Sequence, residues 1–204
     1  MGENQSDNNL VSGRECGACT ACCKTPKIDV PELKKLAGVL CPHCIEGVGC
    51  KIYPRRPPVC RDWHCAWRKM PYLTDHWRPD RCGVLICIVG EGEGIPPEFP
   101  QAGLKFDIID SPRVLTWEPL IRFVGSEIEH GRPVFLGVPT PVGYERRKVF
   151  LNYSLAHAVA LHQKTFMISA LAAAYQLGMQ EALREKTVFA SDVGFHGDGH
   201  ASHV

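Results

Sequence analysis

The pattern of apolar and polar positions changes near residue 79 of this 204-residue chain. Beyond that point, short apolar runs predict β-strands, and longer stretches with apolar residues three or four positions apart predict helices. The expected strands are 84–89, 104–109, 134–138 and 144–151, and the expected helices are 117–130 and 153–185, the second interrupted at Gly178. This order predicts an α+β fold in which a small mixed sheet is accompanied by a long C-terminal helix.

Before residue 79 the chain has few apolar positions, and proline and glycine interrupt it repeatedly. One short helix is expected over 30–37, because Pro31 suits a first helical turn and Leu33, Leu36 and Ala37 form an apolar stripe. Such a segment has little apolar surface to bury. A bound metal can supply the missing stability, because its binding free energy becomes folding free energy.

These differences divide the chain into four segments. Residues 1–14 are polar and are expected to be disordered, 15–78 form a metal-organised cysteine-cluster region, and 79–189 form an α+β region of the same domain. Residues 190–204 are a Gly/His-rich tail, for which an unstructured end is favoured over metal delivery by its histidines. We therefore expect the cysteine-rich half to pack on the sheet rather than to form an independent domain.

Composition and charge exclude several classes of protein. The formal net charge is +1, which argues against a strongly basic nucleic-acid binder. The longest apolar run is too short to span a membrane, so no membrane association is expected. The first residues lack a basic start and an apolar run, which argues against a secretory signal and favours a cytoplasmic protein.

The chemistry is concentrated in the cysteines. Nine of the eleven lie within the first 65 residues: Cys16, Cys19, Cys22, Cys23, Cys41, Cys44, Cys50, Cys60 and Cys65. In a reducing cytosol this density is typical of metal binding rather than of disulfides, and an odd total excludes complete pairing. Thiolates suit zinc, iron in iron–sulfur clusters and Cu(I). We take all nine as candidate metal ligands.

The spacing does not choose between zinc and an iron–sulfur cluster. Two C-x-x-C pairs complete a tetrahedral zinc site. The first three cysteines, at two-residue gaps, also resemble an iron–sulfur run whose fourth ligand would be Cys60 or Cys65. Because neighbouring side chains diverge, Cys22 and Cys23 are not expected to bind one ion together: either they serve two metals, or one of them is a spare thiol. Eight thiols suffice for two four-thiolate sites.

Other residues are weighed against structural roles. Arg56 and Arg61 can donate hydrogen bonds to thiolate sulfurs and balance their charge. Tyr53, Trp63 and Trp67 are expected to pack over the cluster. His43 and His64 can each replace a thiol ligand, although the nearby cysteines make this less favoured. Cys82 and Cys87 flank a strand and are expected to be structural thiols rather than ligands.

Residues 16–67 also resemble a known family. The shared pattern is C-x-x-C-x-x-C-C from Cys16, then Cys41, then C-x-I-Y-x-x-R-P-x-x-C-R-x-W-x-C from Cys50 to Cys65. It resembles the bacterial and archaeal YkgJ-like cysteine-cluster proteins, described as zinc- or iron-chelating. Cys44 is less regular in that family, and Cys82 and Cys87 lie outside the pattern. The resemblance covers about a quarter of the chain and implies metal chelation, without a reaction.

The leading interpretation is therefore a metal-binding protein that holds zinc or an iron–sulfur cluster, with a metal ion or cluster as its partner. One alternative is an iron–sulfur oxidoreductase or other enzyme, since some family members carry that label and a related segment occurs in flagellin lysine methylases. Another is a zinc-ribbon-like module that binds protein or nucleic acid through residues 51–81. This segment contains eight Lys/Arg, only three Asp, and interspersed tryptophans. A role in balancing thiolate charge is favoured for these cations, and a protein partner stays open.

Overall fold

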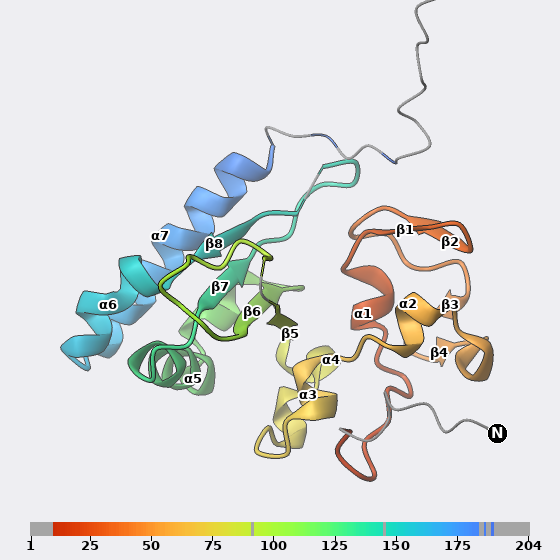
Figure 1. Cartoon of the computed structure of the whole chain (residues 1–204), viewed down its shortest axis with the longest axis horizontal. Coiled ribbons are helices and arrows are strands. Elements are labelled where there is room, and N and C mark those ends of the chain that lie inside the picture. The colour runs from red at the N-terminus through yellow and green to blue at the C-terminus, as the bar shows by residue number, and fades with distance from the viewer. Residues whose placement is uncertain (1–9, 91, 145, 184–185, 187–188, 190–204) are drawn as a thin grey trace, which may run out of the picture.

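The structure, a computed structural model, describes residues 10–90, 92–144, 146–183, 186 and 189. Its centre is a four-stranded mixed sheet with the strand order β5-β6-β7-β8 (Figure 1). β5 and β6 are antiparallel, β6 and β7 are parallel, and β7 and β8 are antiparallel. The strands are β5 (Val84–Val89), β6 (Gly103–Ile108), β7 (Val134–Gly137) and β8 (Lys148–Phe150). The strands predicted at 84–89, 104–109 and 134–138 are confirmed, whereas β8 is shorter than predicted.

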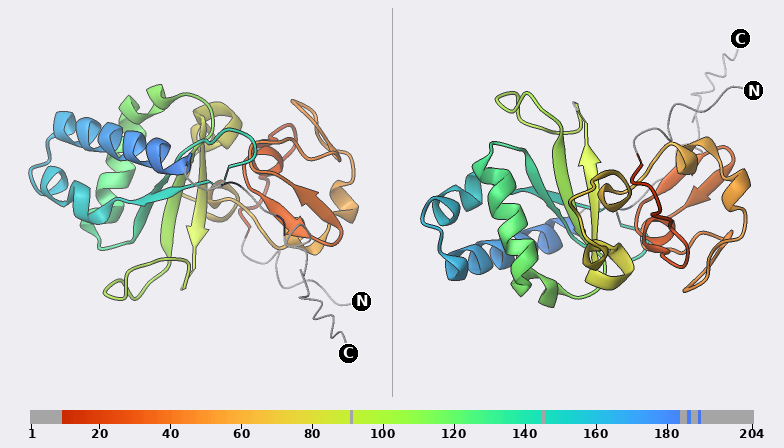
Figure 2. Two further views of the ribbon diagram at one scale, coloured as in Figure 1. Left: turned by 90° about the horizontal axis from the view of Figure 1, so that it is seen from above. Right: turned by 90° about the horizontal axis from the view of Figure 1, so that it is seen from below.

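Three helices cover one face of this sheet: α5 (Glu118–Glu129), α6 (Asn152–Ala160) and α7 (Lys164–Ala182) (Figure 2). α5 is the crossover that joins the parallel strands β6 and β7, as such a connection requires. Its apolar side buries Leu120 and Val124, and Phe123 meets Phe106 of β6 edge-on at 5.4 Å between ring centroids. The helix expected at 117–130 is therefore confirmed.

The long C-terminal helix is two helices, and the prediction of a break at Gly178 is wrong. The chain turns between α6 and α7 at His162, which has a left-handed φ of 49°. Gly178 lies inside α7, where an added Cβ would lie 2.8 Å from Val138 Cγ1 and 3.1 Å from Val149 Cγ2. Because Gly178 has no side chain, α7 can pack closely on the sheet at this point. The glycine therefore serves packing and does not break the helix.

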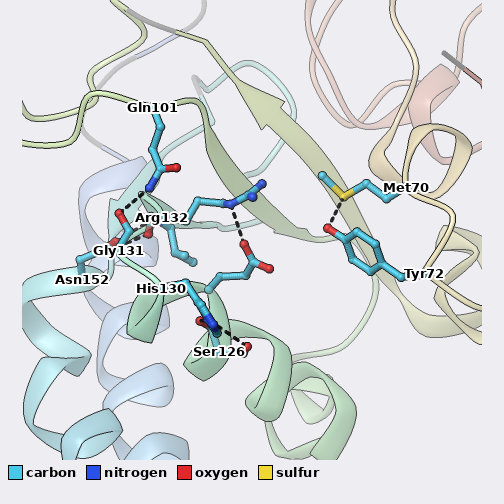
Figure 3. A network of polar contacts seen from close by, with 10 residues as sticks. Met70, Tyr72, Gln101, Ser126, His130, Gly131, Arg132 and Asn152 are labelled. Carbon is cyan, nitrogen blue, oxygen red and sulfur yellow. Dashed lines mark hydrogen bonds and ion pairs between the residues drawn. The ribbon is translucent and has the colours of Figure 1, made fainter. Parts of the chain in front are cut away.

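The start of β7 is fixed by hydrogen bonds from a buried side chain of α6 (Figure 3). The side-chain oxygen Oδ1 of Asn152 accepts a hydrogen bond from Val134 N at 2.8 Å, and the side-chain nitrogen Nδ2 donates to Arg132 O at 2.7 Å. Gln101 donates to Gly131 O at 2.9 Å, and Arg132 pairs with Glu127 at 2.7 Å. These contacts join the loop before β6, the end of α5 and the beginning of α6.

The cysteine-rich half consists of short elements. Two antiparallel hairpins pair β1 (Ile28–Val30) with β2 (Leu33–Lys35), and β3 (Cys44–Ile45) with β4 (Gly49–Cys50). The four-residue helices are α1 (Ala21–Lys24), α2 (Pro58–Arg61), α3 (Ala66–Lys69) and α4 (Pro79–Cys82). The 3-10 turns are η1 (Tyr53–Arg55), η2 (Asp75–Trp77) and, after β6, η3 (Pro112–Thr116).

The helix predicted over 30–37 is wrong, because that segment belongs to the hairpin β1–β2. Burial alternates along β2: Leu33 and Lys35 are buried, and Lys34 between them is exposed. The Lys35 ammonium donates to the carbonyl oxygens of Lys24 and Leu36, each at 3.1 Å, and to that of Pro26. Because the second buried position of the strand is a lysine, the sequence does not show the two-residue apolar periodicity of a strand. The apolar residues that remain have the spacing of a helical stripe.

One hydrophobic core extends from the sheet into the cysteine-rich half. Ala21, Cys65 and Trp67 belong to the same buried cluster as Leu85 and Cys87 of β5. The cysteine-rich half lies on the side of the sheet opposite the three helices (Figure 2). This packing, with both helices and small mixed sheets present, agrees with the predicted α+β class.

The segment before the first cysteine is held against α3. Val11 N donates to Arg68 O at 2.8 Å, and the Arg14 guanidinium donates to four carbonyls that follow or belong to α3: Trp67, Met70, Pro71 and Leu73. Of the region expected to be disordered, residues 1–9 lie outside the described part, as does the predicted tail 190–204. None of the helices in the described part is both long enough and apolar enough to cross a membrane.

Candidate functional site

Eight of the nine clustered cysteines line one cavity of about 350 Å³. They come from six places along the cysteine-rich half: the loop before α1, α1 itself, the loop before β3, β4, α2 and the residue before α3. The eight are Cys16, Cys19, Cys22, Cys23, Cys41, Cys50, Cys60 and Cys65. Residues separated by up to 49 positions in the sequence therefore converge on one space, which we call the thiol cavity.

Backbone hydrogen bonds position these cysteines. Cys19 N donates to Cys16 O at 2.8 Å, and Cys44 N donates to Cys41 O at 2.9 Å, which closes both C-x-x-C turns. Cys41 N donates to Cys23 O at 3.0 Å and thereby joins the second turn to α1. In the hairpin β3–β4, Cys44 lies directly opposite Cys50.

A close approach of two glycines joins the first turn to β4. Gly49 has a left-handed φ of 123°, and a Cβ built on it would lie 2.4 Å from Gly17 O. Gly17 follows Cys16, and Gly49 precedes Cys50. The contact therefore brings two cysteines to the cavity that are far apart in the sequence, and only a glycine at position 49 permits it.

The adjacent thiols of Cys22 and Cys23 interact with each other. Their hydrogen bond is the largest influence on both groups: it raises the pKa of Cys22 well above its ordinary value and lowers the pKa of Cys23 to about 6. Cys22 therefore acts as the donor and Cys23 as the acceptor. Lys35 and Arg56 add smaller contributions that lower the pKa of Cys23.

For five other clustered thiols, burial is the largest cause of a raised pKa. It raises the pKa of Cys65 to about 11 and that of Cys44 to about 12, and it also raises the pKa of Cys19, Cys50 and Cys60. These groups hold their protons near pH 7 when no cation is bound. A metal ion must displace those protons, because only the thiolate is a strong ligand.

The thiol positions do not form a closed coordination shell. Within the described residues, no three side chains of His, Cys, Asp or Glu are arranged to hold a metal ion. The sulfur atoms surround a cavity instead of meeting at one point.

Lys27, Arg56 and Arg68 line the cavity, and two further cations, Lys35 and Arg78, interact with its thiols. Arg56 lies over the Tyr53 ring at 3.7 Å and donates to Tyr53 O at 3.0 Å and Cys60 O at 3.4 Å. Arg78 donates to Cys16 O at 3.3 Å and pairs with Asp80 at 2.9 Å. Arg61, which the sequence places beside Arg56, is exposed at the end of α2 and is not part of the cavity lining.

Arg68 is the most informative of these cations. It lines the thiol cavity and is only 7% exposed, and its Nε and Nη1 atoms are buried without a hydrogen-bond partner. A buried guanidinium whose donors are unsatisfied is costly. The described residues that line the cavity include no aspartate or glutamate, so the thiols are the main groups there that can supply negative charge.

The predicted aromatic and histidine residues divide into two groups. Tyr53, Trp63, His43 and His64 line the cavity, and the Tyr53 hydroxyl donates to Cys16 Sγ at 3.9 Å. Trp67 belongs instead to the main core, beneath the guanidinium of Arg14 at 5.2 Å.

The remaining three cysteines lie beside the cavity. Cys44 is buried, and its thiol donates to Gly49 O at 3.3 Å. Cys82 donates to Val84 O at 3.3 Å, and Cys87 donates to a carboxylate oxygen of Asp107 at 3.5 Å. Cys82 and Cys87 therefore have local hydrogen-bond partners, as expected of structural thiols. Neither of them is part of the cavity lining.

We compared the chain with family models, with curated proteins and with solved structures. None of the three comparisons gives a match. The resemblance to the YkgJ-like proteins therefore stays a prediction from the cysteine pattern, and the function must be argued from the cavity itself.

Sequence reasoning missed Lys35, and it included Arg68 and Arg78 only among the eight Lys/Arg of residues 51–81, without singling them out as cations of the site. No pattern in the sequence distinguishes them from surface cations, because arginine and lysine are mostly exposed. For Arg68, one signal was present: it comes three residues after Cys65, so a short helix beginning there brings both toward the same side.

Proposed function

We propose that the chain is a metal-binding protein that holds zinc or an iron–sulfur cluster in the thiol cavity. The observation that carries this proposal is the convergence of eight free thiols on one space of about 350 Å³. Thiols are soft ligands, and both candidate metals take four of them. The resemblance to the YkgJ-like proteins supports the same chemistry.

The charges around the cavity fit such an occupant. A divalent ion with four thiolates carries a formal charge of about −2. Buried charge must be paired, and Lys35, Arg56, Arg68 and Arg78 place positive charge beside the sulfurs. Metal binding would also supply the unsatisfied donors of Arg68 with thiolate acceptors. Of the arginines in residues 51–81, Arg56 and Arg68 line the cavity and Arg78 acts on Cys19, which favours charge balance over a nucleic-acid surface.

The eight cavity-lining cysteines would hold the metal, and His43 and His64 lie close enough to the lining to replace a thiol. A zinc ion with four thiolates has no open coordination position and would stabilise the fold. An iron–sulfur cluster would supply electron transfer. The cations around the cavity would strengthen either occupant by stabilising the thiolate form of its ligands.

Titration of the reduced apo-protein with cobalt(II) under anaerobic conditions tests this proposal. Cobalt(II) takes zinc sites and gives intense visible absorption when thiolates bind it in a tetrahedral geometry. We expect that absorption to rise with added cobalt, reach a plateau and disappear on addition of zinc. A folded protein that gives no cobalt–thiolate band at millimolar cobalt would contradict the proposal.

Replacement of Arg68 by methionine separates metal binding from folding. Arg68→Met removes the charge and the unsatisfied donors but keeps a long side chain. We expect metal affinity to fall by about 10- to 100-fold, the usual effect of losing a group that supports the ligands. The metal-free protein should be at least as stable as the unchanged chain, because a buried unpaired charge is gone.

The matched control is Arg61→Met, which removes an exposed arginine of the same segment. It should leave both the cobalt affinity and the unfolding midpoint in urea unchanged. Equal effects of the two substitutions on affinity would remove Arg68 from the site.

A further inference from the structure

We propose that the thiol cavity holds two metal centres, divided at the Cys22–Cys23 peptide bond. This inference rests on the proposed function and assigns its ligands. The inner centre takes Cys16, Cys19, Cys22 and Cys65, and the outer centre takes Cys23, Cys41, Cys50 and Cys60. Each set contains four thiols, the number that a tetrahedral zinc ion or an iron–sulfur cubane requires.

The inner set is packed against the sheet. Cys65 belongs to the main hydrophobic core, and Cys19 packs against that core. Cys16 belongs to the same turn as Cys19 through the bond between their backbones. After burial, Cys16 and Cys19 are among the groups that raise the pKa of Cys65, and Cys16 and Cys65 both act on Cys22, so these four thiols are electrostatic neighbours.

The outer set belongs to a separate packing cluster. Cys41 and Cys44 are buried there with Ile28 and Leu33, and Cys23 and Cys60 pack against them. Cys50 reaches the same place because β4 pairs with β3. Cys41, Cys23 and Cys50 are the neighbouring thiols that, after burial, raise the pKa of Cys60.

The two sets meet at α1. Cys22 and Cys23 are consecutive there and hydrogen-bonded to each other, but the other thiol neighbours of Cys22 are Cys16 and Cys65, whereas Cys23 is bonded to Cys44 and acts on Cys50 and Cys60. The ninth cysteine, Cys44, neighbours the outer thiols and is hydrogen-bonded to Cys23, but it is absent from the cavity lining and its thiol donates to Gly49 O. The nine thiols thus divide into two sets of four and one spare.

The cations are divided in the same way. Arg78 acts on Cys19 of the inner set, whereas Arg56 acts on Cys23, Cys50 and Cys60 of the outer set. Lys35, buried on β2, interacts most strongly with Cys41 and Cys23 of the outer set and less with Cys22 of the inner set. Each proposed centre therefore has its own compensating positive charge.

Cadmium-113 NMR of the unsubstituted, reduced apo-protein loaded with cadmium tests the division without any variant. We expect two bound cadmium resonances, each in the range of four-thiolate coordination. Couplings from one resonance should reach the β-protons of Cys16, Cys19, Cys22 and Cys65, and couplings from the other those of Cys23, Cys41, Cys50 and Cys60. A single resonance, or one coupled to cysteines of both sets, would overturn the inference.

Cysteine substitutions provide a second readout, the number of cobalt equivalents bound at saturation. Cys16→Ser and Cys60→Ser should each bind one equivalent instead of two, and the double variant should bind none. Cys16→Ser combined with Cys19→Ser removes two ligands of one set and should still bind one. Cys44→Ser is the control and should bind two.

Failure of this inference is distinguishable from failure of the proposed function. A wild-type protein that binds one equivalent through four cysteines keeps the proposed function and overturns the division into two centres. A wild-type protein that binds none overturns both. The two centres are also not separable if Cys16→Ser loses both cobalt equivalents while Cys60→Ser loses only one.

Discussion

Removal of the metal with a chelator is expected to unfold the outer part of the cysteine-rich half while the sheet β5–β8 stays folded. The outer cluster buries only Ile28, Leu33 and two cysteines fully. Ordering the backbone costs about 1–2 kcal/mol per residue, which so little apolar surface cannot offset. Structural zinc contributes about 10–16 kcal/mol in small domains. The metal would therefore be the main source of order there.

Amide hydrogen exchange, measured with and without chelator, checks this expectation residue by residue. The amides of Cys41 and Lys51, which bond Cys23 O and His43 O, should lose protection by several orders of magnitude. Those of Phe106 and Leu136 in the central strands should change little. Unchanged protection of Cys41 and Lys51 in protein shown to be metal-free would contradict a metal-dependent fold.

Replacement of Gly49 by alanine is expected to have the second-largest effect. The new Cβ would lie 2.4 Å from Gly17 O, so β4 and the Cys16 turn must separate. Overpacking costs about 1–3 kcal/mol, and a left-handed backbone costs a further ~1–2 kcal/mol for a residue with a Cβ. If the metal draws these two segments together, its affinity should fall by roughly 30-fold or more.

Gly47→Ala is the matched control for this substitution. Gly47 lies in the same hairpin turn and also has a left-handed φ, 71°, but an added Cβ meets nothing within 4 Å. It should therefore carry only the backbone cost of about 1–2 kcal/mol. The comparison is made by cobalt titration of both variants, and equal loss of affinity would show that the contact with Gly17 does not matter.

The sequence was sufficient for the parts of the fold that bury continuous apolar runs. β5 is an edge strand, but it is a continuous apolar run that is buried at five of its six positions, β6 lies between two strands and is also largely buried, and α5 carries a clear apolar stripe. The turn between α6 and α7 was not predictable in the same way. Both helices are rich in alanine and leucine, and the break falls at His162, where no proline or glycine marks it.

The cysteines of the candidate site were predictable from the sequence, but the residues around them were not. Eight of the nine clustered cysteines line one cavity, whereas Cys44 and Arg61 do not. Lys35 and Arg68 were not singled out because their burial is meaningful only beside thiols brought together by the whole fold. The grouping of the thiols into two sets likewise depends on tertiary packing, which the spacing of cysteines does not encode.

The most direct test of the central claim is the content of zinc, iron and acid-labile sulfide per chain in untagged protein purified without oxygen. The account predicts about two zinc ions with no sulfide and no colour, or iron with matching sulfide and a broad visible absorption. The first result assigns the thiol cavity to zinc and favours a structural or binding role. The second assigns it to iron–sulfur clusters and favours redox chemistry. A folded protein that contains neither metal would contradict the account.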